Sequence, residues 1–204
     1  MNIKTLMMTF SMALSLLAGP TMAGPLEDGV VAFKGLKYSS AFKIWQPVAE
    51  QGDAHAQDRL AFLYFKGYGV SQDYAKAIKY FRLAADQDLA SARFYLGVMY
   101  ANGLGVGRDD GEAVNWYRQA ANQGDIFAQG NLGAMYNQGL GVPPDFVQAQ
   151  MWFTLAALGF PAAETKYRDG AVGNHDNIAA KMTPGQIAEA QRLAQEWLAV
   201  HPKK

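Results

Sequence analysis

The chain has 204 residues, of which 50% are hydrophobic and 18% are charged, and this composition is typical of a packed globular protein. Its 18 Lys and Arg residues are balanced by 18 Asp and Glu residues. This balance argues against a nucleic-acid-binding protein, because neutralising phosphates requires an excess of basic residues. Cysteine is absent, which excludes disulfide frameworks, cysteine-ligated metals and thiol nucleophiles.

Residues 1–23 are predicted to be a secretory signal peptide. Lys4 supplies a positive charge, an apolar run extends from Leu6 to Leu17, and small residues precede a predicted cut after Ala23. The alternative is a membrane anchor, but the run is shorter than the roughly 20 apolar residues that cross a bilayer. We therefore expect a periplasmic or secreted product without membrane insertion after signal removal.

The sequence then repeats with a period of 36 residues over the units 52–87, 88–123 and 124–159. Ten positions are identical in all three units, and no unit carries an insertion. In the first unit these positions are Ala56, Leu60, Tyr64, Gly67, Gly69, Val70, Asp73, Ala77, Ala84 and Ala85. Such a period indicates repeated copies of one supersecondary element.

Each unit predicts two helices joined by a short turn. In the first unit, apolar residues at helical spacing predict a helix over about Ala54–Lys66, which Gly67 ends in a left-handed conformation. Asp73 is placed to cap a second helix over about Tyr74–Asp86. Since one hairpin cannot bury its own apolar face, the repeats predict an all-α fold, an α/α solenoid of stacked helical hairpins.

The repeated pattern A-x3-L-[AG]-x2-Y-x2-G-x-G-V-x2-D-x3-A-x2-[YW]-[YF]-x2-A-A resembles the Sel1-like repeat, a relative of the tetratricopeptide repeat. The resemblance covers 52–159 and implies a tetratricopeptide-like solenoid in which the first helices line the concave face. It also implies a bacterial exported member that acts as a scaffold for a protein or peptide partner, in envelope complex assembly or signalling. The partner's identity does not follow from the resemblance.

Weaker copies flank the three units. Residues 24–51 are predicted to form a degenerate N-terminal repeat, because Ala41, Trp45 and Ala49 fall one period before core positions of the next unit. Residues 160–182 are predicted to be a degenerate repeat and a loop, with the polar, glycine-containing stretch Asp169–Asn177 as the loop.

A C-terminal capping helix is predicted over 183–200. Thr183 is placed as its N-cap, Pro184 as its first helical residue and Gln186 as the partner in a capping box. The apolar stripe that follows is expected to close the solenoid.

Partner-binding residues are expected on the first helices, at positions that point away from the core stripe. They are His55, Asp58, Phe62 and Phe65 in the first unit, Phe94, Val98 and Asn102 in the second, and Phe127, Asn137 and Gln138 in the third. Exposed aromatic rings anchor peptides, and amides can hydrogen-bond an extended backbone. The alternative is that the rings pack between adjacent first helices.

Two further functions remain open at this point. The segment from Ser40 to Lys43 matches the Ser-x-x-Lys pattern of penicillin-recognising enzymes, and this predicts an alternative enzyme acting on cell-wall or β-lactam amides. The chain lacks the companion SDN and KTG motifs, and the Sel1-like members with such labels are rich in cysteine. The chain is therefore predicted not to be an enzyme. A non-catalytic peptidoglycan binder is the other alternative.

No metal or cofactor is predicted. The three histidines, His55, His175 and His201, are far apart in the sequence and form no HExxH motif. The repeated Gly-x-Gly-Val loops are interpreted as structural turns between helices. The four tryptophans are expected to pack in the core; they are Trp45, Trp116, Trp152 and Trp197.

Overall fold

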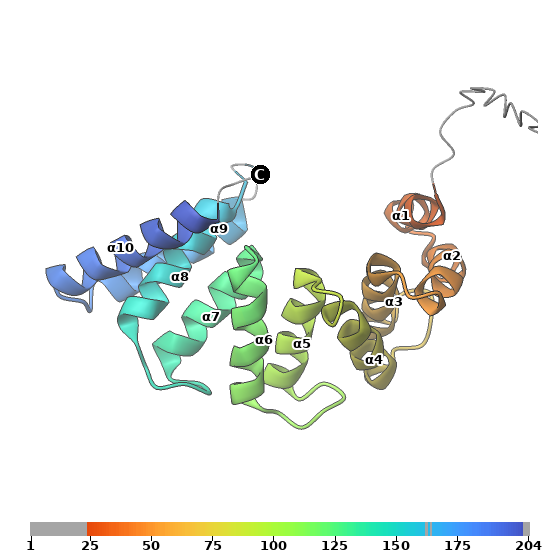
Figure 1. Cartoon of the computed structure of the whole chain (residues 1–204), viewed down its shortest axis with the longest axis horizontal. Helices are drawn as coiled ribbons and strands as arrows, with labels where there is room; N and C mark the ends of the chain where they lie inside the picture. Colours follow the sequence, from red (N-terminus) through yellow and green to blue (C-terminus); the bar gives the residue numbers. More distant parts are fainter. Residues whose placement is uncertain (1–23, 162, 164, 202–204) are drawn as a thin grey trace, which may run out of the picture.

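The computed structural model describes residues 24–161, 163 and 165–201, and the predicted signal peptide lies outside them. Ten helices and no strand occur in these residues, which confirms the predicted all-α fold. The helices are α1 (Pro25–Lys34), α2 (Tyr38–Glu50), α3 (Ala54–Lys66), α4 (Tyr74–Ala85), α5 (Ala90–Asn102), α6 (Asp110–Asn122), α7 (Ile126–Gln138), α8 (Phe146–Gly159), α9 (Thr165–Ala179) and α10 (Pro184–Val200). Successive hairpins stack into an arc, with α1 near one end and α9 and α10 at the other (Figure 1).

The helix ends follow from the repeated glycine and aspartate. α3 ends at Gly67, whose φ of 71° is in the left-handed region that glycine enters at little cost. α4 begins after Asp73, whose side chain accepts a hydrogen bond from the Lys76 N–H at 2.9 Å. The two later units have the same arrangement of glycine and aspartate at their helix ends.

Within each unit, a small residue on the first helix receives an aromatic ring from the second. A Cβ placed at Gly97 would come within 2.6 Å of the Tyr117 ring, and one at Gly133 within 3.0 Å of the Phe153 ring. Tyr117 and Phe153 are nearly fully buried as a result. The repeat position that is always Ala or Gly is therefore the place where the two helices of a hairpin pack against each other.

The second loop glycine of each unit fixes the stacking of neighbouring hairpins. A Cβ at Gly105 would lie 2.6 Å from the Cβ of Tyr74, at the start of the preceding second helix. A Cβ at Gly141 would overlap the backbone carbonyl of Asp110 in the same way. The loops thus contact the preceding hairpin so closely that only glycine fits.

The N-terminal hairpin of α1 and α2 is packed like the later units. Ala41, Trp45 and Ala49 are buried, as the period predicts. The Trp45 indole N–H donates a hydrogen bond to the Leu26 carbonyl at 3.1 Å, and this joins the two helices. All four tryptophans pack against hydrophobic clusters of the core, as predicted.

The prediction of a loop at Asp169–Asn177 is wrong, because these residues lie inside α9. Ala171 and Ile178 are two helical turns apart on one face and are buried, with Ile178 in a cluster that includes Phe153 of α8. Burial of this face against α8 outweighs the low helix propensity of the glycines, a tertiary effect that local sequence does not reveal.

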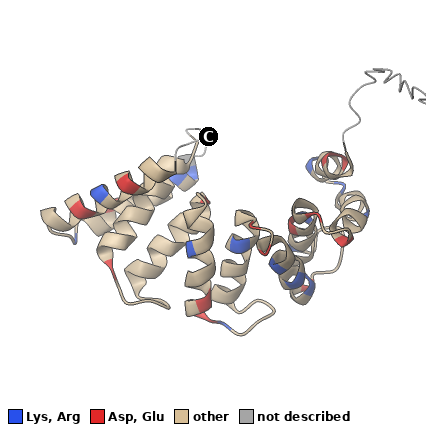
Figure 2. Ribbon diagram, in the orientation of Figure 1, with Lys and Arg blue, Asp and Glu red and all other residues tan. Residues whose placement is uncertain are grey.

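α10 begins with the predicted capping box, in which the Gln186 N–H donates to the Thr183 hydroxyl and the Gln186 side chain accepts from the Thr183 N–H. The helix packs on α8, with the ring centroids of Trp152 and Trp197 6.5 Å apart. Basic and acidic side chains are interspersed along the helices (Figure 2). Of the helices in the described part of the chain, none has the length and apolar character to cross a membrane.

Candidate functional site

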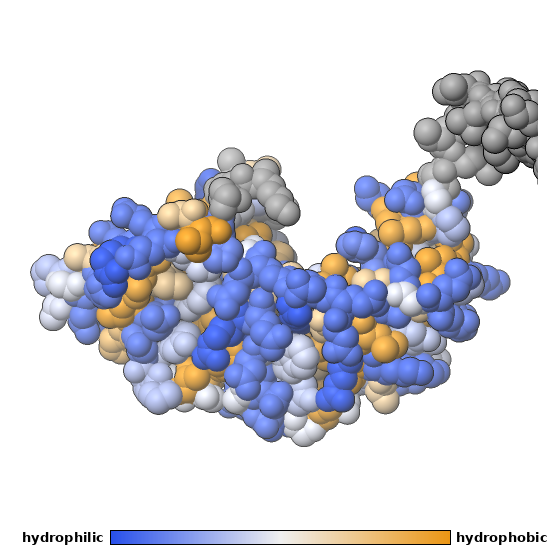
Figure 3. All heavy atoms as spheres, viewed as in Figure 1, coloured by the Kyte–Doolittle hydropathy of each residue, from blue (hydrophilic) through white to orange (hydrophobic). Residues whose placement is uncertain are grey.

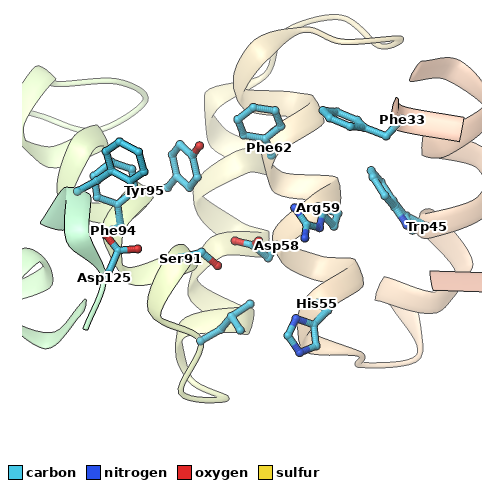
Figure 4. Close-up of a pocket in the computed structure, with 12 residues that line it drawn as sticks. Phe33, Trp45, His55, Asp58, Arg59, Phe62, Ser91, Phe94, Tyr95 and Asp125 are labelled. Carbon is cyan, nitrogen blue, oxygen red and sulfur yellow. The ribbon is translucent and has the colours of Figure 1, made fainter. Parts of the chain in front are cut away.

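The concave side of the arc carries a cavity of about 510 Å³, which we call the concave cavity. Its lining comes mainly from the first helices α3, α5 and α7, with contributions from the N-terminal hairpin (Figure 4). The lining residues are Phe33, Trp45, His55, Asp58, Arg59, Phe62, Leu89, Ser91, Phe94, Tyr95, Asp125 and Phe127. The space-filling view shows that the molecule is hollowed on the side between α1 and α9 (Figure 3).

Six aromatic rings of this lining form a continuous aromatic row from α2 to α7; they are Trp45, Phe33, Phe62, Tyr95, Phe94 and Phe127. Successive ring centroids along the row are 5.8, 6.0, 5.5, 5.1 and 6.0 Å apart. These separations are within the range of favourable aromatic contacts. Phe127 is 43% exposed, while Phe62 and Phe94 are half-buried, so the row presents ring surface to the cavity.

Polar groups lie beside the aromatic row. Asp58 points toward Ser91, and Asp125 lies beyond Ser91 (Figure 4). Asp58 is only 7% exposed, and its Oδ1 atom has no hydrogen-bond partner in the described part of the chain. Burial raises the pKa of Asp58 to about 6, and the Arg59 charge and the Ser91 hydroxyl offset only part of this rise.

Asp125 is the N-cap of α7, where its carboxylate accepts a hydrogen bond from the Ala128 N–H at 2.8 Å. Burial nevertheless raises the pKa of Asp125. Burial, together with the charges of Asp58 and Asp125, raises the pKa of Tyr95 to about 12. The cavity therefore combines apolar walls with two poorly solvated carboxylates.

Five of the ten residues predicted to bind a partner line the concave cavity. They are His55, Asp58, Phe62, Phe94 and Phe127. The alternative prediction, that these rings pack between adjacent first helices, also holds in part. Phe62 contacts Tyr95 and Phe94 contacts Phe127 across adjacent first helices. The same rings thus join the units and line the cavity.

The other five predicted residues lie elsewhere. Asn102 and Gln138 are exposed at the last turns of α5 and α7, and the Asn102 amide donates a hydrogen bond to the Val98 carbonyl at 2.7 Å. Asn137 is half-buried beside Gln138. Val98 packs against two core clusters, so it contributes to stability between units.

The prediction that Phe65 points away from the core is wrong. Its side chain is 9% exposed, and its ring centroid lies 6.4 Å from that of Phe81 and 5.5 Å from that of Tyr95. The stacking of the second unit on the first covers this position, which a single helix viewed alone would leave open.

Sequence reasoning missed several residues of the cavity. Arg59 and Tyr95 directly follow the predicted positions Asp58 and Phe94, so a stripe one residue wider would have included them. Asp125 occupies an N-cap, a position that suggests a structural role alone. Phe33 lies in the degenerate hairpin, where no periodic signal marks it.

A second cavity, of about 270 Å³, continues along the concave side between α7, α8 and α9. Phe127 lines both cavities, and Gly130, Ala134 and Tyr167 contribute to the second one. The exposed ring of Tyr167 lies 5.4 Å from that of Phe127 and extends the aromatic surface toward α9.

The serine of the Ser-x-x-Lys pattern does not lie in the concave cavity. Ser40 and Lys43 are exposed on α2, and Ser39 donates its hydroxyl hydrogen bond to the Gly69 carbonyl at 3.1 Å. Lys37 occupies the N-cap of α2, and no side chain caps that helix by a hydrogen bond. No group of three acidic or histidine side chains suited to a metal ion occurs in the described residues.

The arc of stacked hairpins with a lined concave side defines a helical-repeat solenoid of the tetratricopeptide-like class. The chain belongs to the Sel1 repeat family, whose sequence pattern matches residues 54–89, 90–125 and 126–159. Proteins built from such repeats typically mediate protein–protein interactions and are generally non-catalytic scaffolds.

Two solved structures are similar over most of the chain. A Sel1 repeat protein from Oxalobacter formigenes is 27% identical with a TM-score of 0.66, and the match covers 88% of this chain and 75% of that one. A protective antigen of uropathogenic Escherichia coli strains, which displays an SLR fold, is 28% identical with a TM-score of 0.58. That match covers 86% of this chain but only 45% of the antigen. No curated protein matches the chain in sequence.

Proposed function

We propose that this protein is an exported scaffold that binds an extended peptide, or a loop of a partner protein, along its concave side. The observation that carries the proposal is the aromatic row, which crosses five helices and faces a cavity of about 510 Å³. A row of rigid rings supplies apolar contact area with little loss of side-chain entropy on binding.

The predicted signal peptide supports export, with a mature chain that starts at Gly24 and acts in the periplasm or outside the cell. An envelope location gives the scaffold a role in complex assembly or signalling there. The penicillin-recognising alternative is not favoured, because Ser40 is exposed on α2 and does not line the concave cavity.

Photo-crosslinking in living cells tests this proposal. A photoreactive amino acid replaces Phe127, the most exposed ring of the aromatic row, and a second variant carries it at exposed Gln119 on α6 as the matched control. We expect an envelope-derived partner to crosslink at position 127 but not at 119, to a chain whose N-terminus is Gly24.

The double variant Phe62→Ala, Phe94→Ala is expected to abolish that crosslink while the helical circular dichroism spectrum is retained. Equal crosslinking from positions 119 and 127, or crosslinking that survives the double variant in a folded protein, would contradict concave-side binding.

A further inference from the structure

One carboxylate oxygen beside the concave cavity has no hydrogen-bond partner in the described part of the chain. Asp58 is more than nine-tenths buried, and its Oδ1 atom has no hydrogen-bond partner there. A buried carboxylate oxygen without a hydrogen-bond partner is costly, so it gains much from a donor that enters the cavity. The carboxylate points from α3 toward Ser91 on α5 (Figure 4).

Asp125 adds a second acidic group to the same cavity. Within the described residues, neither Asp58 nor Asp125 takes part in an ion pair. Arg59 also lines the cavity, but its side chain lies on the side toward Trp45 (Figure 4). Two carboxylates outside any ion pair thus lie at one end of the cavity, although Asp125 also accepts the capping hydrogen bond from the Ala128 N–H.

The walls beside these carboxylates are apolar. Phe62, Phe94 and Tyr95 lie along the same part of the cavity, and aromatic faces attract cations while they cover aliphatic chains (Figure 4). An acidic ligand would be repelled here, and a purely apolar ligand would leave the Asp58 Oδ1 atom without a hydrogen-bond donor. A long aliphatic stem that ends in a cation satisfies both parts of the surface.

We propose that the concave cavity receives a lysine or arginine side chain of the bound peptide, with the cationic end between Asp58 and Asp125 and the stem against the aromatic row. This inference rests on the proposed peptide-binding function and names the residue type that such a partner must present. The aromatic row then provides contact area, and the two carboxylates select the basic residue.

A random peptide library displayed on phage tests the inference with the full chain as bait. Peptides are retained for analysis only if the double variant Phe62→Ala, Phe94→Ala, shown to be folded, fails to bind them. We expect these peptides to share a lysine or arginine next to apolar residues.

Synthetic copies of a selected peptide then test the charge directly. Replacing the basic residue with norleucine or citrulline, or replacing the bait with Asp58→Asn, should weaken binding at least about tenfold, the usual effect of losing a charge-assisted hydrogen bond. Asp53→Asn is the matched control, since Asp53 is the α3 N-cap, equivalent to Asp125, but does not line the cavity. That variant should bind as the parent does.

The outcomes separate the two proposals. Peptides that need the aromatic row but share no basic residue, or that bind Asp58→Asn as tightly as the parent, overturn this inference and leave concave-side binding intact. A selection that yields no peptide dependent on Phe62 and Phe94 overturns both.

Discussion

In the three central units, the second loop glycine lies against the preceding hairpin, whereas Gly170 and Gly173 in α9 have no atom within 4 Å of a Cβ position. The central glycines are therefore required by packing between units, and those of α9 are not. α9 and α10 instead depend on α8, which contacts both of them. Close backbone contacts thus join the central units, whereas the C-terminal end is held mainly by side-chain packing on α8.

The largest expected effect on stability comes from disrupting the contact between two central units. Gly141 has a φ of 68°, and a Cβ there would overlap the Asp110 carbonyl. Gly141→Ala should therefore lower the free energy of unfolding by about 3 kcal/mol, the sum of backbone strain and displacement of a packed loop. Chemical denaturation followed by circular dichroism measures the loss.

Gly107→Ala is the control for this prediction, because Gly107 lies in a similar loop, has no positive φ and has no atom near a Cβ. Equal unfolding midpoints for the two variants would show that the loops do not hold the units together.

A second prediction concerns the buried carboxylate of Asp58 in the central units. The pKa of Asp58 is about 6 in the folded protein and about 4 in an unfolded chain, so folding favours its protonated form. At pH 7 its ionisation destabilises the folded state, and Asp58→Asn should raise the free energy of unfolding by about 2 kcal/mol. This gain should shrink as the pH falls from about 6 to about 4, and it should disappear below about 4, where Asp58 is protonated in both states.

Unfolding midpoints of parent and variant, measured across this pH range, test the prediction, and Asp53→Asn serves as the exposed control. A gain that does not depend on pH would mean that ionisation of Asp58 does not cost stability. A confirmed gain would mean that the central repeats give up stability at the cavity that we propose binds a basic side chain.

The smallest expected effect is a gain at the C-terminal end. Gly170→Ala should raise the free energy of unfolding by about 0.5–1 kcal/mol, because alanine forms helix more readily and the added Cβ meets open space. Gly133→Ala on α7 is the matched substitution in a central helix, where the Cβ would press on the Phe153 ring at 3.0 Å. The midpoint of thermal unfolding should rise for Gly170→Ala and should not rise for Gly133→Ala. The reverse result would contradict the comparison of the two regions.

Much of the fold was predictable because the repeated residues act locally. Gly67 and Asp73 mark helix ends through the conformation of one residue and one side-chain hydrogen bond. Thr183 and Gln186 define the start of α10 in the same way. The α9 helix was not predictable, because its stability comes from burial of Ala171 and Ile178 rather than from the propensities of its own residues.

The candidate site was only partly predictable. Helical spacing identified Phe62 and Phe94 as concave-side residues, since the 36-residue period places them on equivalent helices. The same spacing misplaced Phe65, which the next unit covers, and missed Tyr95. Which side chains of one helix stay open depends on how the next hairpin is rotated against it.

The sequence by itself determined the period, the hairpins and their caps, because these depend on interactions within a few residues and on one repeated apolar pattern. Only the tertiary structure decided that Asp58 and Asp125, which are 67 residues apart, lie in one cavity beside the aromatic row. The physical reason is that the curvature of a solenoid accumulates from small rotations between packed units. Those rotations bring together side chains that no local pattern relates.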